Sequence, residues 1–151
     1  MKYANLYVCP SALALNGRPI HPRNIAQLNT LADIPGIKMI LPYRGMDHPT
    51  RQNWRKSVTL YEWQFALHCF GLRVPVRAKL FGRPYGTSDL LVIAFDEAMG
   101  YAKPRPWAFV TAQGHDPATE VQSARHLVQI LPSAGITDLK LEEIYHALTI
   151  P

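Results

Sequence analysis

Residues 59–80 read TLYEWQFALHCFGLRVPVRAKL and predict a helix followed directly by a strand. Thr59 and Glu62 have the spacing of a capping box, in which each side chain accepts a hydrogen bond from the other residue's backbone amide. Gly71 suits the left-handed position that ends a helix. From Arg73 to Leu80 apolar and basic residues alternate, as they do in a strand with one buried face. The stretch therefore predicts a helix over 60–70 and a strand over 73–80.

Downstream of this stretch the pattern predicts two more strands and two helices. Pro75 cannot donate a ladder hydrogen bond, so the strand 73–80 should lie at a sheet edge or carry a bulge. Residues 89–95, DLLVIAF, form an unbroken apolar run that is typical of a strand covered on both faces. Residues 107–112 predict a further strand, and helices are expected over 117–131 and 138–148. We expect the strands between 73 and 113 to be neighbours, with 89–95 at the centre of the sheet.

Upstream, the first residues predict a hairpin, a helix and a strand. Tyr3 to Val8 alternate like a strand, and Asn16-Gly17 is a dipeptide that favours a tight hairpin turn. A helix is predicted over 23–33, a strand over 37–41 and a loop over 43–57.

The 151 residues are typical of one α/β domain, with a central mixed sheet flanked by helices. No apolar run approaches the roughly 20 residues that a membrane-spanning helix needs. The first residues lack the pattern of a signal peptide, so we expect a cytoplasmic protein. Cys9 and Cys69 have no metal-binding spacing and are predicted to be buried thiols.

Positive charge is concentrated in the middle of the chain. Lysine and arginine number 16 against 11 acidic residues, which gives a net charge of +5 and favours polyanionic partners. The basic residues between 44 and 83 are Arg44, Arg51, Arg55, Lys56, Arg73, Arg77, Lys79 and Arg83. Only Asp47 and Glu62 oppose them there, whereas acidic residues predominate after His115.

The order of the predicted elements resembles the core of the PD-(D/E)xK nuclease superfamily over residues 57–131. Glu62 matches the family's helix acid, and Asp89, in the stretch GTSDLLV, matches its strand acid. The resemblance implies a restriction-endonuclease-like core, with 1–56 as an extension, 132–151 as a C-terminal helix, and a divalent metal such as Mg²⁺ at an active site.

The third catalytic element of that family is missing. Where a Glu-x-Lys should stand, residues 109–113 read FVTAQ, with neither an acid nor a lysine. The local patterns also explain Glu62 as a capping residue and Asp89 as a turn residue. No cofactor is expected unless the nuclease site is active, and whether the protein is an enzyme stays open.

Nucleic-acid binding is the expected function. The predicted binding residues are basic or aromatic. Those in or just after the strand 73–80 are Arg73, Arg77, Lys79, Arg83 and Tyr85, and those in the loop 43–57 are Arg51, Arg55 and Lys56. Edge-strand lysine and arginine also prevent aggregation, which is the alternative explanation of this charge. Two other functions stay open: a non-enzymatic protein-interaction or inhibitor protein, and a metal-independent ribonuclease that uses His48 or His115. The oligomeric state is not predicted.

Overall fold

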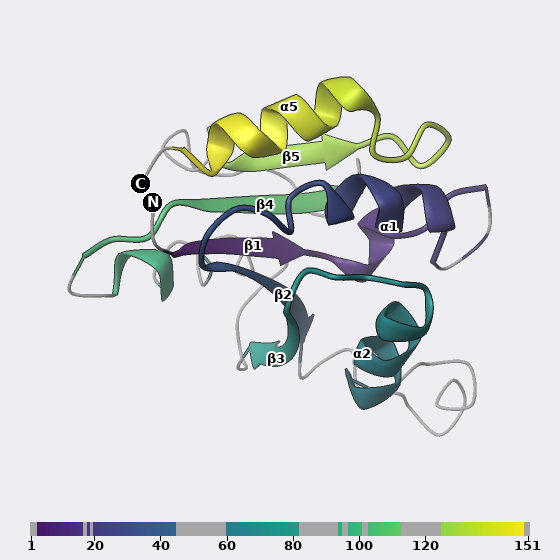
Figure 1. The fold of residues 1–151 in the computed structure, drawn as a ribbon, viewed down its shortest axis with the longest axis horizontal. Helices are drawn as coiled ribbons and strands as arrows, with labels where there is room; N and C mark the ends of the chain where they lie inside the picture. Colours follow the sequence, from purple (N-terminus) through teal and green to yellow (C-terminus); the bar gives the residue numbers. More distant parts are fainter. Residues whose placement is uncertain are drawn as a thin grey trace.

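The strands of the sheet all run parallel. The computed structural model describes residues 3–16, 18, 20–44, 60–81, 94, 97–100, 103–112 and 125–149. Its strands are β1 (Ala4–Val8), β2 (Ile37–Arg44), β3 (Val76–Phe81), β4 (Trp107–Ala112) and β5 (Leu127–Ile130). They form one five-stranded sheet in the order β3-β2-β1-β4-β5 (Figure 1). The chain first builds the sheet outward from β1 to β3 and then returns to the other side of β1, which is the order of a doubly wound sheet.

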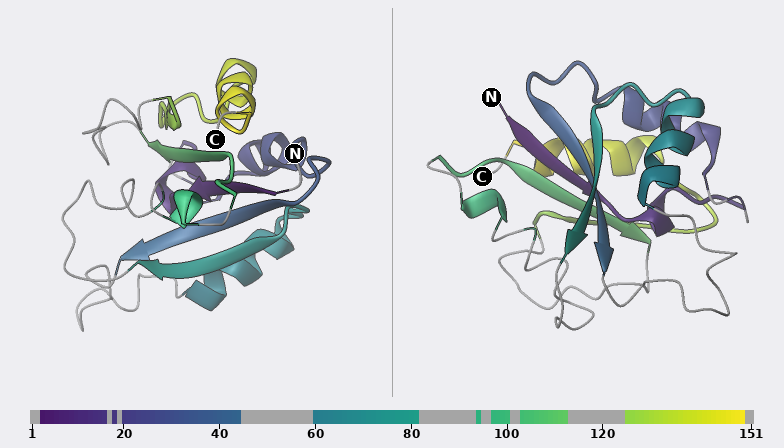
Figure 2. Two further views of the ribbon diagram at one scale, coloured as in Figure 1. Left: turned by 90° about the vertical axis from the view of Figure 1, so that its left-hand side faces the viewer. Right: turned by 90° about the horizontal axis from the view of Figure 1, so that it is seen from below.

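Three helices cover one face of the sheet. They are α1 (Pro22–Asn29), α2 (Leu60–Cys69) and α5 (Asp138–Ala147), and a short 3-10 helix, η1 (Pro10–Ala12), follows β1. Their buried residues pack with those of the strands in one aliphatic cluster. Residue 94 and residues 97–99 are helical too, and Ala94 and Ala98 pack against the opposite face (Figure 2). We call the face under α1, α2 and α5 the first face and the opposite one the second face.

Local signals explain where α1 begins and where α2 ends. His21 caps α1 by accepting a hydrogen bond from the amide of Arg23 at 3.1 Å, and Pro22 stands at the first helical position. Gly71 follows α2 with φ of 87°, and the amide of Leu72 donates to the carbonyl of Leu67 at 3.0 Å. This is a Schellman closure, so the prediction of a helix over 60–70 that ends at a left-handed glycine is confirmed.

Asn24 is a fully buried polar residue of α1 that ties two loops together. Its Nδ2 donates to the carbonyls of Ala12, Leu13 and Ala14 at 3.5, 3.1 and 3.3 Å. Its Oδ1 accepts from the amide of Ile136 at 2.9 Å. The loop after β1 and the loop before α5 are thereby joined through one side chain.

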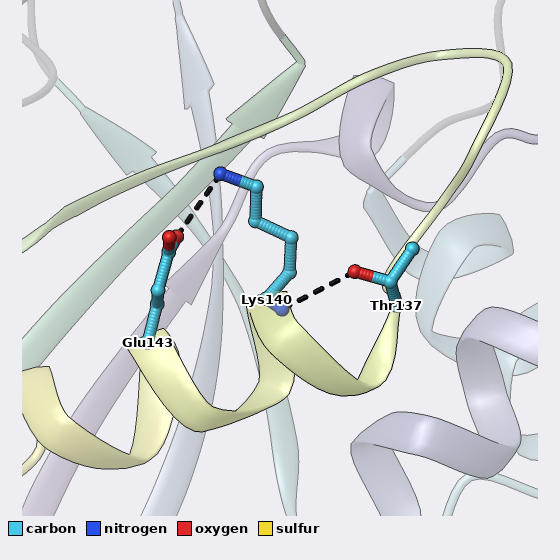
Figure 3. A network of polar contacts seen from close by, with 3 residues as sticks. All are labelled: Thr137, Lys140 and Glu143. Carbon is cyan, nitrogen blue, oxygen red and sulfur yellow. Dashed lines mark hydrogen bonds and ion pairs between the residues drawn. The ribbon is translucent and has the colours of Figure 1, made fainter.

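The start of α5 is held by a side-chain cap. The Oγ1 of Thr137 accepts a hydrogen bond from the amide of Lys140 at 3.2 Å, and the Nζ of Lys140 lies 3.0 Å from a carboxylate oxygen of Glu143 (Figure 3). The prediction of a last helix over 138–148 is confirmed.

The predictions for β2, β3 and β4 are confirmed as strands. β2 continues through Pro42 to Arg44, beyond the predicted end at residue 41 and into the predicted loop over 43–57; the rest of that loop, 45–57, lies outside the described residues. Among the described residues β3 is an edge strand, as Pro75 indicates, and it begins at Val76 rather than at Arg73. The predicted helix over 23–33 is shorter, because α1 ends at Asn29 and is followed by turns.

The predicted N-terminal hairpin is wrong. β1 is buried along its whole length and pairs in parallel with β2 on one side and β4 on the other, so it is the central strand. The Asn16 turn does form, with φ of 52°, but it closes only an isolated bridge between Leu15 and Arg18. A strand with both faces buried needs neighbours on both sides, and β1 finds them in distant segments.

The predicted strand order is also wrong, and the sheet is parallel rather than mixed. β3 and β4 are separated by β2 and β1. Residues 89–93 lie outside the described residues, and Ala94, which the apolar run predicts to be in a strand, is helical. Periodicity alone does not distinguish a short buried strand from a buried helix.

Two further predictions are wrong: the end of the helix predicted over 117–131, and the burial of Cys69. Residues 127–130 form β5, although the sequence predicts a helix over 117–131; residues 117–124 lie outside the described residues. Cys69 is exposed, whereas Cys9 is buried as predicted. α2 buries the side that carries Leu67, and Cys69 lies on another side of the helix. Within the described ranges, no helix is long and apolar enough to cross a membrane.

Candidate nucleic-acid interface

The two faces of the sheet differ in chemistry. On the first face the strands present aliphatic residues to the helices, among them Leu6, Met39 and Val110. On the second face β1 and β4 present aromatic and polar residues, which in strand order are Asn5, Tyr7, Trp107, Phe109 and Thr111. Aliphatic packing alone would account for a stable core, so the polar residues of the second face are the ones to consider for function.

The β2–β3 half of the second face is basic. Ladder register places Lys38, Ile40 and Arg77 on this face, because Lys38 is the partner of Asn5 and Arg77 is the partner of Ile40. Arg77 is exposed and Lys38 is half-exposed. We call Lys38 and Arg77 the β2–β3 basic face. Lys79 follows Arg77 by two positions in β3, and its side chain lies outside the described part of the structure.

Arg73 has a structural role that its sequence position did not reveal. Its amide donates to Oδ1 of Asn29 at 2.7 Å, and its guanidinium Nη2 lies 3.4 Å from the carbonyl oxygen of Asn29. Asn29 is the last residue of α1, so the arginine meets a carbonyl at a helix C-terminus, where positive charge is stabilising. Arg73 precedes β3 and is bound to α1, so it is not simply a third member of an alternating basic row.

The other predicted binding and catalytic residues are placed only in part. Glu62 lies in α2, within Leu60–Cys69. The remaining ones lie outside the described residues: Asp89, Arg83, Tyr85, Arg51, Arg55 and Lys56, together with His48 and His115. Within the described ranges no group of three or more His, Cys, Asp or Glu residues could hold a metal ion.

In the β1–β4 half of the second face, buried polar side chains form a hydrogen-bonded network that the sequence patterns did not predict. The Nδ2 of Asn5 donates to the hydroxyl of Tyr7 at 3.0 Å, and that hydroxyl donates to Oε1 of Glu97 at 2.8 Å. The Nη1 of Arg105 lies 3.5 Å from Oδ1 of Asn5, and its guanidinium carbon is 5.0 Å from the centre of the Tyr3 ring. Asn5 and Tyr7 in the β1 sequence ANLYV were the available signal, since a central parallel strand is usually apolar throughout.

The stacked rings of Trp107 and His126 lie on the same half of the sheet as this network. The rings of Trp107 and His126 are 4.3 Å apart and inclined by 8°, and Nδ1 of His126 lies 2.7 Å from the carbonyl oxygen of Trp107. Burial lowers the pKa of His126 below its ordinary value; the hydrogen bond to Trp107 raises it and the charge of Arg125 lowers it. The net direction is downward, so the neutral ring with its proton on Nδ1 is favoured.

The segments that follow β2 and β3 in the sequence leave from the same end of the sheet and carry basic residues. β2 ends at Arg44 and β3 ends at Phe81, and these parallel neighbours end at the same edge. The segment 45–59, which contains Arg51, Arg55 and Lys56, begins at that edge, as does the segment 82–93, which contains Arg83. In doubly wound sheets ligands bind outside the carboxyl ends of the strands, at the point where the strand order reverses.

That reversal point lies between β1 and β4. The amide of Cys9 donates to the carbonyl of Val110 at 2.8 Å, and the amide of Ala112 donates to Oγ of Ser11 at 3.3 Å. η1 therefore packs against the end of β4, and no glycine-rich loop follows β1 in the sequence CPSAL, which argues against a dinucleotide phosphate loop here.

Comparison with known proteins finds no match for this chain. No family model, no curated protein and no solved structure matches it. Its function must therefore be inferred from the residues and their geometry.

Proposed function

We propose that this protein binds nucleic acid and that the β2–β3 basic face is part of the contact. The observation that carries the proposal is that Arg77 is exposed on the second face of an edge strand, with Lys38 on the same face of the next strand. A sheet surface with spaced cations can neutralise successive phosphates of a backbone.

Chain connectivity adds positive charge to the carboxyl ends of the same two strands. The segments that leave β2 and β3 carry four basic residues that the sequence predicts to bind nucleic acid: Arg51, Arg55, Lys56 and Arg83. Both segments start from the two strands that form the basic face. The net charge of +5 has the sign that a polyanion requires.

The test is a double substitution, Lys38→Glu with Arg77→Glu. Binding of a fluorescein-labelled mixed-sequence duplex and of a single strand is followed by anisotropy over a salt series. We expect weaker binding at low salt, and a log affinity that depends less steeply on log salt by roughly 0.7–0.9 for each phosphate that is no longer neutralised. Thermal unfolding should change little, since exposed charges contribute only about 0–1 kcal/mol.

A matched control changes the same charge on the first face. Arg23→Glu with Lys140→Glu alters α1 and α5 and leaves the β2–β3 basic face intact. If the two double variants bind alike, the effect is one of net charge alone and the assigned surface is wrong. If the Lys38 and Arg77 variant is folded and binds as the wild type does, the nucleic-acid proposal fails.

A nuclease-like origin of the core is the narrower part of the proposal. It is supported by the order of α2, which contains Glu62, and the strand β3 that follows it, as the resemblance implies. The same proposal assigns no catalytic step, because β4 carries no acid and no lysine. Binding without cleavage is the function that these residues favour.

A further inference from the structure

A groove separates α5 from the outer edge of β5. Its volume is approximately 470 Å³, and it is lined from both elements by Arg125, Leu127, Val128, Leu139, Glu142, Glu143 and His146. α5 lies beside β5 and runs in the opposite direction (Figure 1). The groove is at the opposite edge of the sheet from β3, so it is distinct from the β2–β3 basic face.

The backbone of β5 offers hydrogen-bonding groups on its outer side. Within the described part of the chain, β5 pairs with β4 alone. The amide of Phe109 donates to the carbonyl of His126 at 2.7 Å. Because successive residues of a parallel strand direct these groups to alternate sides, those of Leu127 and Gln129 point away from β4. Such an edge can accept a further strand.

A stripe of α5 forms the other wall. Leu139, Glu142, Glu143 and His146 have the i, i+3, i+4, i+7 spacing of one helix face, and Leu139 is 64% exposed. Because α5 and β5 are antiparallel, His146 lies at the Arg125 end of the groove and Leu139 at the other. The groove therefore has a basic end, an acidic middle and an apolar end.

The acidic middle has a carboxylate available for a partner. Glu143 is engaged by Lys140 at 3.0 Å (Figure 3), whereas Glu142 is exposed and makes no ion pair within the described residues. A cation placed opposite Glu142 would complete the charge pattern.

We propose that this groove binds an extended segment of a partner protein as a sixth strand beside β5. The stripe from Leu139 to His146 is roughly 10 Å long. Three alternate side chains on one face of a strand span about 13 Å, which is a similar length. The fitting segment has an acidic residue near Arg125, a lysine or arginine opposite Glu142, and an apolar residue against Leu139. Main-chain pairing supplies affinity and these three side chains supply specificity.

The charge pattern disfavours a second copy of this chain in the groove. A two-fold pairing of β5 with β5 would bring the two α5 helices side by side, with Glu142 and Glu143 of both copies near the axis. Four carboxylates would then meet without a compensating cation beyond the two Lys140 partners, and like charges at an interface oppose association.

The experiment uses fluorescein-labelled peptides of defined charge order as probes. TDVKVLT fits a parallel strand and TLVKVDT fits an antiparallel one; TKVEVLT and TLVEVKT are the matched peptides with the charges exchanged. We expect the wild type to prefer the lysine-centred member of one pair by about twofold to fivefold, the effect of an exposed ion pair. Glu142→Lys should abolish this preference, because the contact at Arg125 then opposes the one at position 142, whereas Asp33→Lys, an equal charge change after α1, should leave it unchanged.

Two changes test the main-chain pairing. Gln129→Pro removes an outward amide without breaking the ladder to β4, so peptide binding should be abolished while the thermal midpoint is nearly kept. If this variant unfolds, N-methylation of the valines in the peptide removes the same hydrogen bonds from the other side, and binding should again be abolished. Three results would overturn the proposal: no peptide bound at millimolar concentration, binding that survives both changes, or a wild-type dimer that Gln129→Pro dissociates.

Discussion

At the scale of single residues, Asn24 is the polar side chain on which the arrangement of loops most depends. Gly135 lies so close that a Cβ there would be 2.6 Å from Oδ1 of Asn24, and its φ of 69° also favours glycine. The buried amide thus needs both its own hydrogen bonds and a neighbour without a side chain.

We predict that Asn24→Ala lowers the free energy of unfolding by about 1–3 kcal/mol, because the amide of Ile136 and the carbonyl of Leu13 lose a buried partner. Urea denaturation measures the change. Gln27→Ala is the control on the same helix: its Nε2 bonds to Asp138 at 2.8 Å on the surface, and its removal should cost within about 0.5 kcal/mol. Equal destabilisation in the two variants would contradict the role assigned to Asn24.

His126 should make the stability depend on pH. Its pKa in the folded protein lies below the unfolded value of about 6.5, so the unfolded chain binds the proton more tightly. Its contribution is complete above about pH 6.5 and decreases as the pH falls from there toward the folded pKa. His126→Phe keeps a ring against Trp107 and cannot titrate. The thermal midpoint of this variant should therefore fall less than that of the wild type between about pH 7 and pH 5; parallel curves would exclude His126 as the cause.

At the scale of elements, α5 depends on its cap. We predict that Thr137→Ala costs about 1 kcal/mol of unfolding free energy, because the amide of Lys140 loses its acceptor, and that Thr137→Ser restores most of it. Thr149→Ala, at the opposite end of the helix, is the comparison, since its hydroxyl only donates to the exposed carbonyl of His146. A larger destabilisation at Thr149 than at Thr137 would contradict the prediction.

Elements with local signals were predicted well. The left-handed glycine after α2 and the proline near the start of β3 act within a few residues, so the sequence indicates them directly. Strand order depends on which distant segments meet, and nothing local in β1 identifies residues 37–40 and 107–110 as its neighbours. β5 was missed because Val128 and Leu131 continue a helical stripe from Val121 and Ala124, and so short a strand does not outweigh that pattern.

Only those parts of the candidate site that depend on local patterns were predicted. Alternation in residues 76–79 correctly predicts that Arg77 is exposed. The position of Lys38 on the same face was not predicted, because it depends on how β2 pairs with β1 and β3. Arg73 was included on its spacing, but its hydrogen bonds to Asn29 come from a helix 44 residues earlier in the chain.

At the scale of the whole molecule, the strand order bears on catalysis. β4 is the strand where the nuclease resemblance requires a Glu-x-Lys beside the strand of Asp89, and β4 is flanked by β1 and β5 instead. We predict no cleavage of duplex or single-stranded DNA with Mg²⁺ or Mn²⁺ above the rate in buffer alone. Gel analysis beside a metal-dependent nuclease measures this. Metal-dependent cleavage that Asp89→Ala abolishes would show that the prediction is wrong.

The central position of β1 has a consequence for synthesis. Its first residues leave the ribosome before any partner strand exists, and β4 follows about 100 residues later, which takes roughly 5–20 s at ordinary rates of elongation. During that time the most buried strand of the domain has one side unpaired. We expect nascent chains that stop short of Trp107 to be sensitive to proteases and prone to aggregate, and the complete chain to fold slowly for its size, because its sheet is closed by contacts between distant residues.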